Sequence, residues 1–420
     1  MPRAAGTPGA ALGAVAAVLL ALGAAPAARA ELEVCPTCAL RSVRTAIERA
    51  APGERIVVRA GRYREGNLVV DKPLELVGDG EAILDGGGEV EVLTVRANDV
   101  SVRGLVIENS GMSYTTDLAA IRVEDARNCV LEGNRIRNAF FGIYLAQVVA
   151  CVVEDNEVVG QAVSETSSGN AIHLWKADYV RVVNNHVAGH RDGIYLEFTR
   201  SGVIEGNVSE HNLRYGLHFM FSERNTYTRN TFRANGAGVA VMYSKHVTMR
   251  ENHFVDNWGA AAYGLLLKEM SDSEVLGNMF ARNTVGLYAE GANRIAVDRN
   301  VFVRNGWAIR VMADSMGVVF AHNRFVGNTF EVATNGTRSY NSFLENFWSD
   351  YDGYDLDRDG VGDVPHRPVR LFALLVERYP VALVLLRSPL LEFLDLAERV
   401  MPMLTPRVMA DHRPLMRSRL

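Results

Sequence analysis

The sequence predicts an all-β fold, a right-handed parallel β-helix with about 22 residues in each coil, and two ladders of recurring residues support this prediction. An asparagine occurs nine times at intervals of 22 to 29 residues. A small residue recurs beside it in the same register. Coils of nearly constant length that stack on one another produce such ladders. The asparagines are Asn134, Asn156, Asn185, Asn207, Asn230, Asn252, Asn278, Asn300 and Asn323, and the small residues are Gly142, Ala171, Gly193, Gly216, Gly238, Gly264, Gly286 and Ala308.

Within each coil the pattern indicates three short strands and three turns. Residues one and three places after the small residue are apolar in every coil, so both columns should face the core. The asparagine should occupy a turn, bond from coil to coil through its amide and tolerate left-handed backbone. Helical spacing is absent inside the units, which argues against helical and leucine-rich repeats. A column of stacked aromatic rings is expected in the core at Phe232, Phe254, Phe280, Phe302 and Phe325.

Residues 1–30 have the features of a secretory signal peptide. Arg3 supplies a positive charge, an apolar run follows, and Ala28-Arg29-Ala30 has the pattern of a cleavage site. The formal charge of the chain is −5, and it becomes −7 when the two arginines of this segment are removed. This mild acidity argues against nucleic acid as a partner. We therefore expect an exported protein whose β-helix, with its cap, occupies residues 31–345.

A short amphipathic helix over Ala39–Ala51 should cap the open end of the first coil, because a solenoid needs such a cap. Less regular strands follow at residues 55–59, 68–70, 74–77 and 93–95. These segments should form the first coils of the stack.

The four cysteines fall into two pairs. Cys35 and Cys38 form a C-x-x-C motif at the start of the expected mature chain. Cys129 and Cys151 each precede a ladder asparagine by five residues, so they should lie in the same register about 4.8 Å apart. That separation permits a disulfide, but parallel side chains in the core favour two free thiols.

Three coils are longer than the others. Their extra residues fall at 110–118, 161–169 and 258–262, and all three insertions occupy the turn just before the small residue. Insertions on one face of a solenoid often mark its binding face.

A cluster on the adjoining outward columns has the chemistry of a Cu(I) site. His218 and Met220 should share one strand face, and Met242 should lie about 4.8 Å from Met220 on the next coil. One histidine and two thioethers are soft ligands that suit Cu(I). The alternative is an apolar outer patch that the long loops or a partner covers.

Residues 346–368 contain a segment that is similar to a calcium-binding loop. Gly360 stands at the sharp sixth position, but position 12 holds His366 instead of the bidentate glutamate. The segment predicts a structural Ca²⁺ that braces a closing cap, and the alternative is an Asp/Gly-rich surface turn. The candidate ligands are the carboxylates of Asp355, Asp357, Asp359 and Asp363 and the carbonyl of Val361.

Residues 369–420 form an apolar tail that charges and prolines interrupt. Its apolar runs fall short of the ~20 residues that a membrane-spanning helix needs. We expect amphipathic helices that either fold back on the solenoid or dock on a membrane protein or at the membrane interface. The candidate docking residues are Leu374, Leu375, Leu385, Leu386, Leu390 and Phe393.

Taken together, these features resemble the NosD family of periplasmic proteins that assist maturation of nitrous-oxide reductase. The most specific part is Trp348-Ser349-Asp350-Tyr351, which leads into the Asp/Gly-rich segment up to Pro365 and then the apolar tail. The coil repeats are less specific, since many sugar-acting β-helix proteins share them. The resemblance covers essentially the whole mature chain.

The resemblance implies a non-enzymatic periplasmic role beside an ABC permease and its ATPase. The assembly takes part in building the copper–sulfur centre of nitrous-oxide reductase, and it receives copper from a chaperone lipoprotein. The tail would then dock on the permease as a peripheral association, and the cluster of His218, Met220 and Met242 would hold Cu(I) in transit. Cys35 and Cys38 would form a disulfide that fixes the cap or, alternatively, a copper-binding thiolate pair.

An enzyme is the competing interpretation, because parallel β-helices often carry polysaccharide lyases or epimerases. His173, Tyr195, Glu197 and His218 could supply acid, base and stacking groups. Glycosidase chemistry, however, needs a close carboxylate pair, and Glu197 has no evident partner. A pure binding scaffold is a third possibility, and the fold alone does not separate the three.

Overall fold

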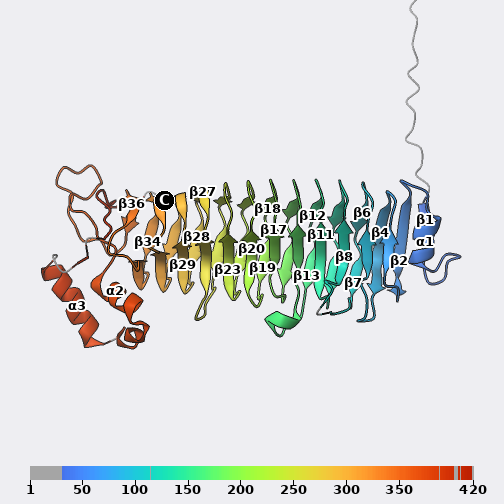
Figure 1. Ribbon diagram of the computed structural model, residues 1–420, viewed down its shortest axis with the longest axis horizontal. Coiled ribbons are helices and arrows are strands. Elements are labelled where there is room, and N and C mark those ends of the chain that lie inside the picture. Colours follow the sequence, from blue (N-terminus) through green and yellow to red (C-terminus); the bar gives the residue numbers. More distant parts are fainter. Residues whose placement is uncertain (1–30, 114, 387, 402–404, 407, 419–420) are drawn as a thin grey trace, which may run out of the picture.

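The computed structural model describes residues 31–113, 115–386, 388–401, 405–406 and 408–418, so the predicted signal peptide lies outside it. The described chain forms a right-handed parallel β-solenoid, as predicted, which Figure 1 shows as one long stack of coils. Each regular coil contributes three strands, and each strand pairs in parallel with the corresponding strand of the next coil.

The strands form three stacks that run the length of the solenoid. One stack is a separate 12-stranded sheet. The other two belong to a single 25-stranded sheet, because β4 pairs with both β6 and β7. The 12-stranded sheet consists of β3 Leu68–Val70, β5 Leu93–Val95, β8 Ala119–Glu124, β11 Phe141–Ala146, β14 Ile172–Trp175, β17 Ile194–Glu197, β20 Tyr215–Met220, β23 Ala237–Met242, β26 Tyr263–Lys268, β29 Val285–Glu290, β32 Trp307–Val311 and β35 Phe330–Ala333.

The second stack follows every third strand from β6. It consists of β6 Ser101–Arg103, β9 Val130–Glu132, β12 Val152–Glu154, β15 Arg181–Val183, β18 Val203–Glu205, β21 Thr226–Thr228, β24 Thr248–Arg250, β27 Ser271–Leu276, β30 Asn293–Asp298, β33 Met316–Ala321 and β36 Tyr340–Leu344. The third consists of β7 Val106–Glu108, β10 Arg135–Arg137, β13 Glu157–Val159, β16 His186–Ala188, β19 Val208–Glu210, β22 Thr231–Arg233, β25 His253–Val255, β28 Met279–Ala281, β31 Val301–Val303, β34 Arg324–Val326 and β37 Phe347–Trp348.

The N-terminal cap is confirmed, with a helix shorter than predicted. The stack begins with β1 (Glu31–Val34), β2 (Arg55–Tyr63) and β4 (Glu75–Asp85), which pair in parallel on successive coils, and α1 spans Val43–Arg49. The Ser42 hydroxyl accepts a hydrogen bond from the Thr45 N–H and caps the helix. Val43, Ala46 and Ile47 bury the apolar face of α1 over the open coil.

The asparagine ladder forms a continuous hydrogen-bonded column. The side-chain oxygen of Asn252, for example, accepts bonds from the backbone N–H and from the side-chain amide of Asn230. The prediction that the asparagine itself is left-handed is wrong, because positive φ occurs one residue earlier, as at Arg229 and Glu251. The asparagines are buried, so their coil-to-coil bonds satisfy amides that water does not reach.

A second buried asparagine ladder runs five residues after the first, and the sequence analysis missed it. The side-chain oxygen of the first member accepts from the His190 N–H, and each later one accepts from the backbone N–H of the preceding member. The members are Asn212, Asn235, Asn257, Asn283, Asn305 and Asn328.

The predicted aromatic column is confirmed inside the core. Successive ring centroids from Phe232 to Phe325 lie 5.6, 4.7, 4.6 and 5.0 Å apart, and Trp348 extends the stack at 4.1 Å. Cys129 and Cys151 are buried free thiols, as expected. The ladder assigned from the sequence ends at Asn323, and the structure continues the repeat through β37, with Asn346 as the next member of the first asparagine ladder.

The predicted tail is an arm that leaves the last coil and returns to it. Val369 and Met409 both belong to the solenoid core. Between them lie α2 (Leu371–Arg378), the 3₁₀ helix η2 (Pro380–Leu385) and α3 (Pro389–Val400), at the end of the solenoid opposite α1 (Figure 1). Helix α2 packs on β35, where Phe372 contacts Phe330, and Glu377 accepts two hydrogen bonds from Arg310.

Candidate functional site

The outer face of the 12-stranded sheet carries the predicted copper ligands. Loops lengthened by the insertions join β7 to β8, β13 to β14 and β25 to β26, so all three lie at the edge where strands of this sheet begin. The second loop contains the 3₁₀ helix η1 (Glu165–Ser167), which projects below the coils in Figure 1. The first two loops border a hollow of about 300 Å³ that Ser110, Met112, Gln161, Ser167 and His190 help to line.

Four rings lie in contact across successive coils of this face, and one pair of them, Tyr144 and His173, is stacked in parallel. The centroid of His173 lies 4.4 Å from that of Tyr144 and 4.7 Å from that of Tyr195, and the Tyr195 and His218 rings are 4.8 Å apart. The sequence pattern placed these side chains outward, and their neighbours on the outer columns cover them. His173 is only 8% exposed and His218 only 4%. The histidines therefore belong to a packed outer layer of the sheet.

His218 is held beside a buried ion pair. Asp192 is completely buried, and its carboxylate accepts hydrogen bonds from Arg214 at 2.9 and 2.6 Å. His218 Nδ1 lies 3.8 Å from Asp192 Oδ2 and 3.4 Å from Arg214 Nη2. Burial acts most strongly on Asp192 and raises its pKa, but the hydrogen bonds from Arg214 and the neighbouring His218 outweigh burial and lower this pKa below its ordinary value. Asp192 is thus an anion whose carboxylate faces Nδ1 of His218 at 3.8 Å.

The other ring nitrogen, His218 Nε2, is buried and has no hydrogen-bond partner among the described residues. A buried polar atom without a partner is costly, and an incoming ligand can satisfy it. Metal-binding histidines commonly use one nitrogen for the metal while a neighbouring group orients the other. In His218, Nε2 is the nitrogen without a partner, and Nδ1 faces Asp192 and Arg214.

The two predicted thioethers lie side by side in the sheet. Met220 on β20 pairs in register with Met242 on β23, and both side chains are partly exposed. The Tyr195 hydroxyl donates a hydrogen bond of 3.4 Å to Met220 Sδ. Burial raises the pKa of Tyr195 to about 12, so its hydroxyl stays protonated and remains a donor. The structure therefore brings together the strand-sharing pair His218 and Met220 and the cross-strand pair Met220 and Met242.

Two further histidines are kept neutral by burial. Burial lowers the pKa of His173 to about 3 and that of His190 to about 4. His173 Nδ1 lies 2.9 Å from the side-chain amide of Asn170, and the Nε2 atoms of both histidines lack a hydrogen-bond partner among the described residues.

Sequence reasoning missed Asn170 and Asp192. The signal that could have found them is a polar residue directly before the small-residue ladder, where Tyr215 and Ala237 stand in the next two coils.

Cys35 and Cys38 are joined by a disulfide at the N-terminal cap. Of the two alternatives for this motif, the structure has the disulfide form. Neither sulfur is then a thiolate, so copper binding at this motif would require prior reduction.

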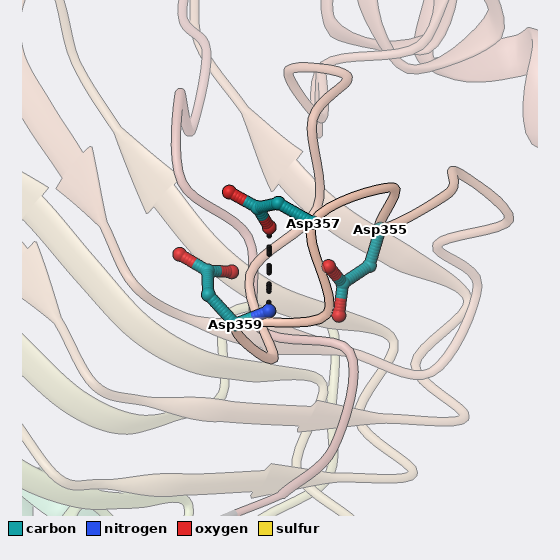
Figure 2. Close-up of side chains that lie close together, drawn as sticks. All are labelled: Asp355, Asp357 and Asp359. Atoms are coloured by element: carbon teal, nitrogen blue, oxygen red, sulfur yellow. Dashed lines mark hydrogen bonds between the residues drawn. The ribbon is translucent and has the colours of Figure 1, made fainter.

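The Asp/Gly-rich segment forms a compact loop at the last coils. Asp355, Asp357 and Asp359 offer three carboxylate oxygens within 4.8 Å of one another (Figure 2). Asp355 Oδ1 is buried without a hydrogen-bond partner among the described residues. Asp363 instead accepts a hydrogen bond from the Leu356 N–H at 2.6 Å, and His366 contacts Glu331 at 2.7 Å. The loop therefore gathers three of the five predicted ligands. At position 12, His366 contacts Glu331 and does not join this group.

The predicted docking residues divide into two groups. Leu374 packs on the solenoid core, and Leu385 and Leu386 pack in the cluster around Phe372. Leu375, Leu390 and Phe393 are exposed. The arm thus folds back on the solenoid, as one expectation had it, and docking of its exposed apolar residues on a membrane partner stays a prediction. None of the described helices is long and apolar enough to cross a membrane.

Comparisons with known proteins address the same segments. A family model described as "Periplasmic copper-binding protein (NosD)" matches residues 154–353. A Pseudomonas aeruginosa protein named "Probable ABC transporter binding protein NosD" is 33% identical over 411 residues, which cover 91% of this chain and 95% of the relative. A protein of the same name from Stutzerimonas stutzeri is 29% identical over 378 residues, covering 85% of this chain and 86% of the relative.

Among solved structures, the catalytic unit of a GH87 alpha-1,3-glucanase from Streptomyces thermodiastaticus superposes with a TM-score of 0.53. It is 13% identical, and the match covers 74% of this chain and 67% of that chain. At this identity the likeness shows a shared β-helix fold and carries no information about activity.

Proposed function

The chain belongs to the NosD family of periplasmic copper-binding proteins, and from that premise we propose that it receives Cu(I) and hands it on beside an ABC-type transporter. The destination is the copper–sulfur centre of nitrous-oxide reductase, and the source is a copper chaperone lipoprotein. The permease with its ATPase is the third partner. The protein acts in the periplasm, as the description of the family supports.

The observation that carries the copper proposal is the unsatisfied Nε2 of His218 on the strand that also carries Met220, the cross-strand partner of Met242. His218 and Met220 are two residues apart on β20 and so project from the same face, and Met242 is the cross-strand partner of Met220. Imidazole and thioether ligands suit Cu(I), whereas hard cations prefer oxygen. One imidazole and two thioethers on an outer sheet face are three neutral ligands, and such a set suits a site from which the metal must leave again.

Binding of Cu(I) by the mature protein under anaerobic reducing conditions, measured against a competing chelator, tests this proposal. The double variant Met220→Leu/Met242→Leu should lose most of the affinity. Met279→Leu is the matched control, because Met279 is also a partly exposed strand residue and lies on a different face, beside His253. Cys35→Ser/Cys38→Ser reports any contribution from the N-terminal motif. Equal affinity for Cu(I) in the wild type and the double variant would show that Met220 and Met242 do not bind the metal.

The arm supplies the docking surface for the permease in this proposal. Its exposed apolar residues include Val381, Val384, Leu390, Phe393, Leu396 and Val400. Exposed apolar residues gathered on η2 and α3 in this way are typical of a protein or membrane interface. Association is then peripheral, since the helices dock and do not span the bilayer.

The geometry favours a binding protein over a carbohydrate enzyme. Glu197 pairs in register with Trp175 and Met220, so neither neighbouring strand places a carboxylate beside it. Retaining glycosidases need two carboxyl groups about 5 Å apart, and inverting ones about 6.5–9.5 Å. Incubation with anionic polysaccharides should accordingly yield no product.

We also propose that the loop at Asp355, Asp357 and Asp359 binds a structural Ca²⁺. The convergence of three carboxylates and the buried, unpartnered Asp355 Oδ1 support this proposal. Val361, the predicted carbonyl ligand, follows this group and pairs with Leu415. An ion there would link the loop to the segment that closes the last coil.

A further inference from the structure

Three exposed aromatic side chains form a ridge along one edge of the 12-stranded sheet. Phe198, Phe221 and Tyr243 are 44%, 46% and 46% exposed. They follow β17, β20 and β23 directly, on three successive coils. Their ring centroids are 5.4 and 5.1 Å apart, and both pairs of ring planes are inclined by 13°. The ridge lies at the edge where the strands end, opposite the edge that carries the inserted loops.

The fold does not require aromatic residues at this position. The equivalent turn residue is Asp125, Gln147, Lys176 or Glu269 in other coils, and each of these also has a positive φ between 49° and 56°. Phe198, Phe221 and Tyr243 have φ values of 53°, 49° and 51°. A bulky residue with left-handed backbone is an energetic disadvantage. Three in succession therefore point to a use of the rings outside the fold itself.

The arrangement of the rings indicates a protein partner. The two nearly parallel contacts cover the ring faces of Phe221, so edges form much of its exposed surface. Sugar-binding platforms present free ring faces, and this ridge offers few of them. Arg200, Glu223 and Lys245 border a neighbouring open hollow of about 480 Å³, in which Glu223 and Lys245 form an ion pair of 3.3 Å. An apolar centre with a polar rim is the usual composition of a protein interface.

The ridge is continuous with the thioether pair. Met220 directly precedes Phe221, and Met242 directly precedes Tyr243. The same cross-strand step that pairs Met220 with Met242 also stacks Phe221 on Tyr243. A protein that brings a metal to the two sulfurs must therefore come to lie beside the rings. We propose that the ridge of Phe198, Phe221 and Tyr243 is the docking site of a Cu(I)-carrying protein, which is thereby seated with its metal at Met220 and Met242.

This inference rests on the proposed copper function, and the experiment separates the two. The probe is the soluble domain of the copper chaperone from the same organism, loaded with Cu(I). The triple variant Phe198→Gln/Phe221→Gln/Tyr243→Gln removes the ridge and should fold, because Gln147 occupies the same left-handed turn in another coil. Gln147→Ala/Glu269→Ala is the matched control at the same position of other coils. Association is measured by biolayer interferometry, and Cu(I) affinity by chelator competition.

The triple variant should bind the chaperone about tenfold or more weakly, as expected for buried aromatic anchors, with its own Cu(I) affinity unchanged. The control variant should bind like the wild type. Chaperone binding that survives in the triple variant, or that is absent in the wild type, overturns the inference. Self-association of the wild type that the triple variant abolishes would assign the ridge to a second copy instead. Ridge-dependent docking by a wild type that binds no Cu(I) would support the docking site and refute the copper site.

Discussion

The carboxylate of Asp411 takes the place of the next asparagine above Asn346. Its Oδ2 accepts hydrogen bonds from the backbone N–H and the side-chain amide of Asn346, both at 2.9 Å, and from Trp348 Nε1 at 3.2 Å. Asp411 is fully buried and lies 65 residues further along the chain. An acidic residue from a distant segment thus completes the column that asparagines build elsewhere.

Replacement of Asp411 should open the last coil. Asp411→Ala leaves three buried donors without an acceptor, which should reduce the free energy of unfolding by about 3 kcal/mol. Asp411→Asn should cost much less, because an asparagine oxygen accepts the same pair of bonds throughout the ladder. Urea unfolding of both variants measures the difference, and equal losses would contradict the acceptor role.

The hydroxyl of Tyr195 should compete with copper for Met220. In Tyr195→Phe the sulfur loses its 3.4 Å donor, and the affinity for Cu(I) should rise by about threefold, the equivalent of one weak hydrogen bond. Tyr288→Phe is the control, because Tyr288 stands in the same outer column four coils further along. Chelator competition measures both. A weaker affinity in Tyr195→Phe would show that the phenol assists binding.

The stability of the solenoid should fall in mild acid. His173 and His190 stay neutral in the fold because burial lowers the pKa of each to about 3 and about 4, whereas in the unfolded chain each takes up a proton near pH 6.5. The unfolded state binds more protons below pH 6.5, so this stabilisation is fully present above that pH and declines as the pH falls toward 4. Between pH 6.5 and pH 5, each histidine should reduce the free energy of unfolding by about 2 kcal/mol.

Urea unfolding at pH 7.5 and pH 5 checks this dependence. His190→Gln should reduce the difference between the two pH values, and the exposed His246→Gln should leave it as it is in the wild type. A variant of His190 with the full pH difference would assign the acid sensitivity to other groups.

Calcium should stabilise the last coils. With Ca²⁺ at 100 times its dissociation constant, the free energy of unfolding of the wild type should rise by about 2.7 kcal/mol, and EDTA should remove this increase. Asp357→Asn/Asp359→Asn should abolish the gain. Asp352→Asn, an exposed carboxylate just before the loop, should retain it. Differential scanning calorimetry with and without Ca²⁺ reports the shift, and an identical shift in the double variant would place the ion elsewhere.

The two sides of the arm should respond differently to substitution. Phe372→Ala removes a buried ring that packs on Phe330, and it should destabilise the arm by about 3 kcal/mol. Leu390→Gln/Phe393→Gln alters side chains that are 47% and 65% exposed, so unfolding should change little. Binding to permease-containing proteoliposomes should nevertheless drop in the double variant. Unchanged binding there would exclude α3 as the contact.

Periodicity explains why so much of the fold was predictable. Each coil repeats the same contacts, so Asn230 or Phe254 can be assigned from its spacing without knowledge of distant residues. The same logic failed at Asp411, because the residue that closes the ladder follows a long non-repeating arm. Alternation also gives only the side of a strand. It placed His218 outward correctly, but its 4% exposure results from rings on neighbouring coils.

The candidate site was predictable only in its ligand types. His218, Met220 and Met242 follow from the register, whereas the orienting Asp192 lies at a turn where the sequence pattern assigns no direction to a side chain. The aromatic ridge was missed for a similar reason. Phenylalanine is a residue type usually found in protein cores, so Phe198 and Phe221 give no sign of exposure in the sequence. Their exposure depends on left-handed turns that also accommodate Lys176 and Glu269.

The arm is attached to the body of the protein at two points. Val369 and Met409 are both buried in the solenoid core, and the helices lie between them. The mechanical consequence is that a pull on α2 or α3 is divided between two anchors instead of unravelling one free end. A membrane partner that displaces these helices would therefore act on the terminal coil through both Val369 and Met409.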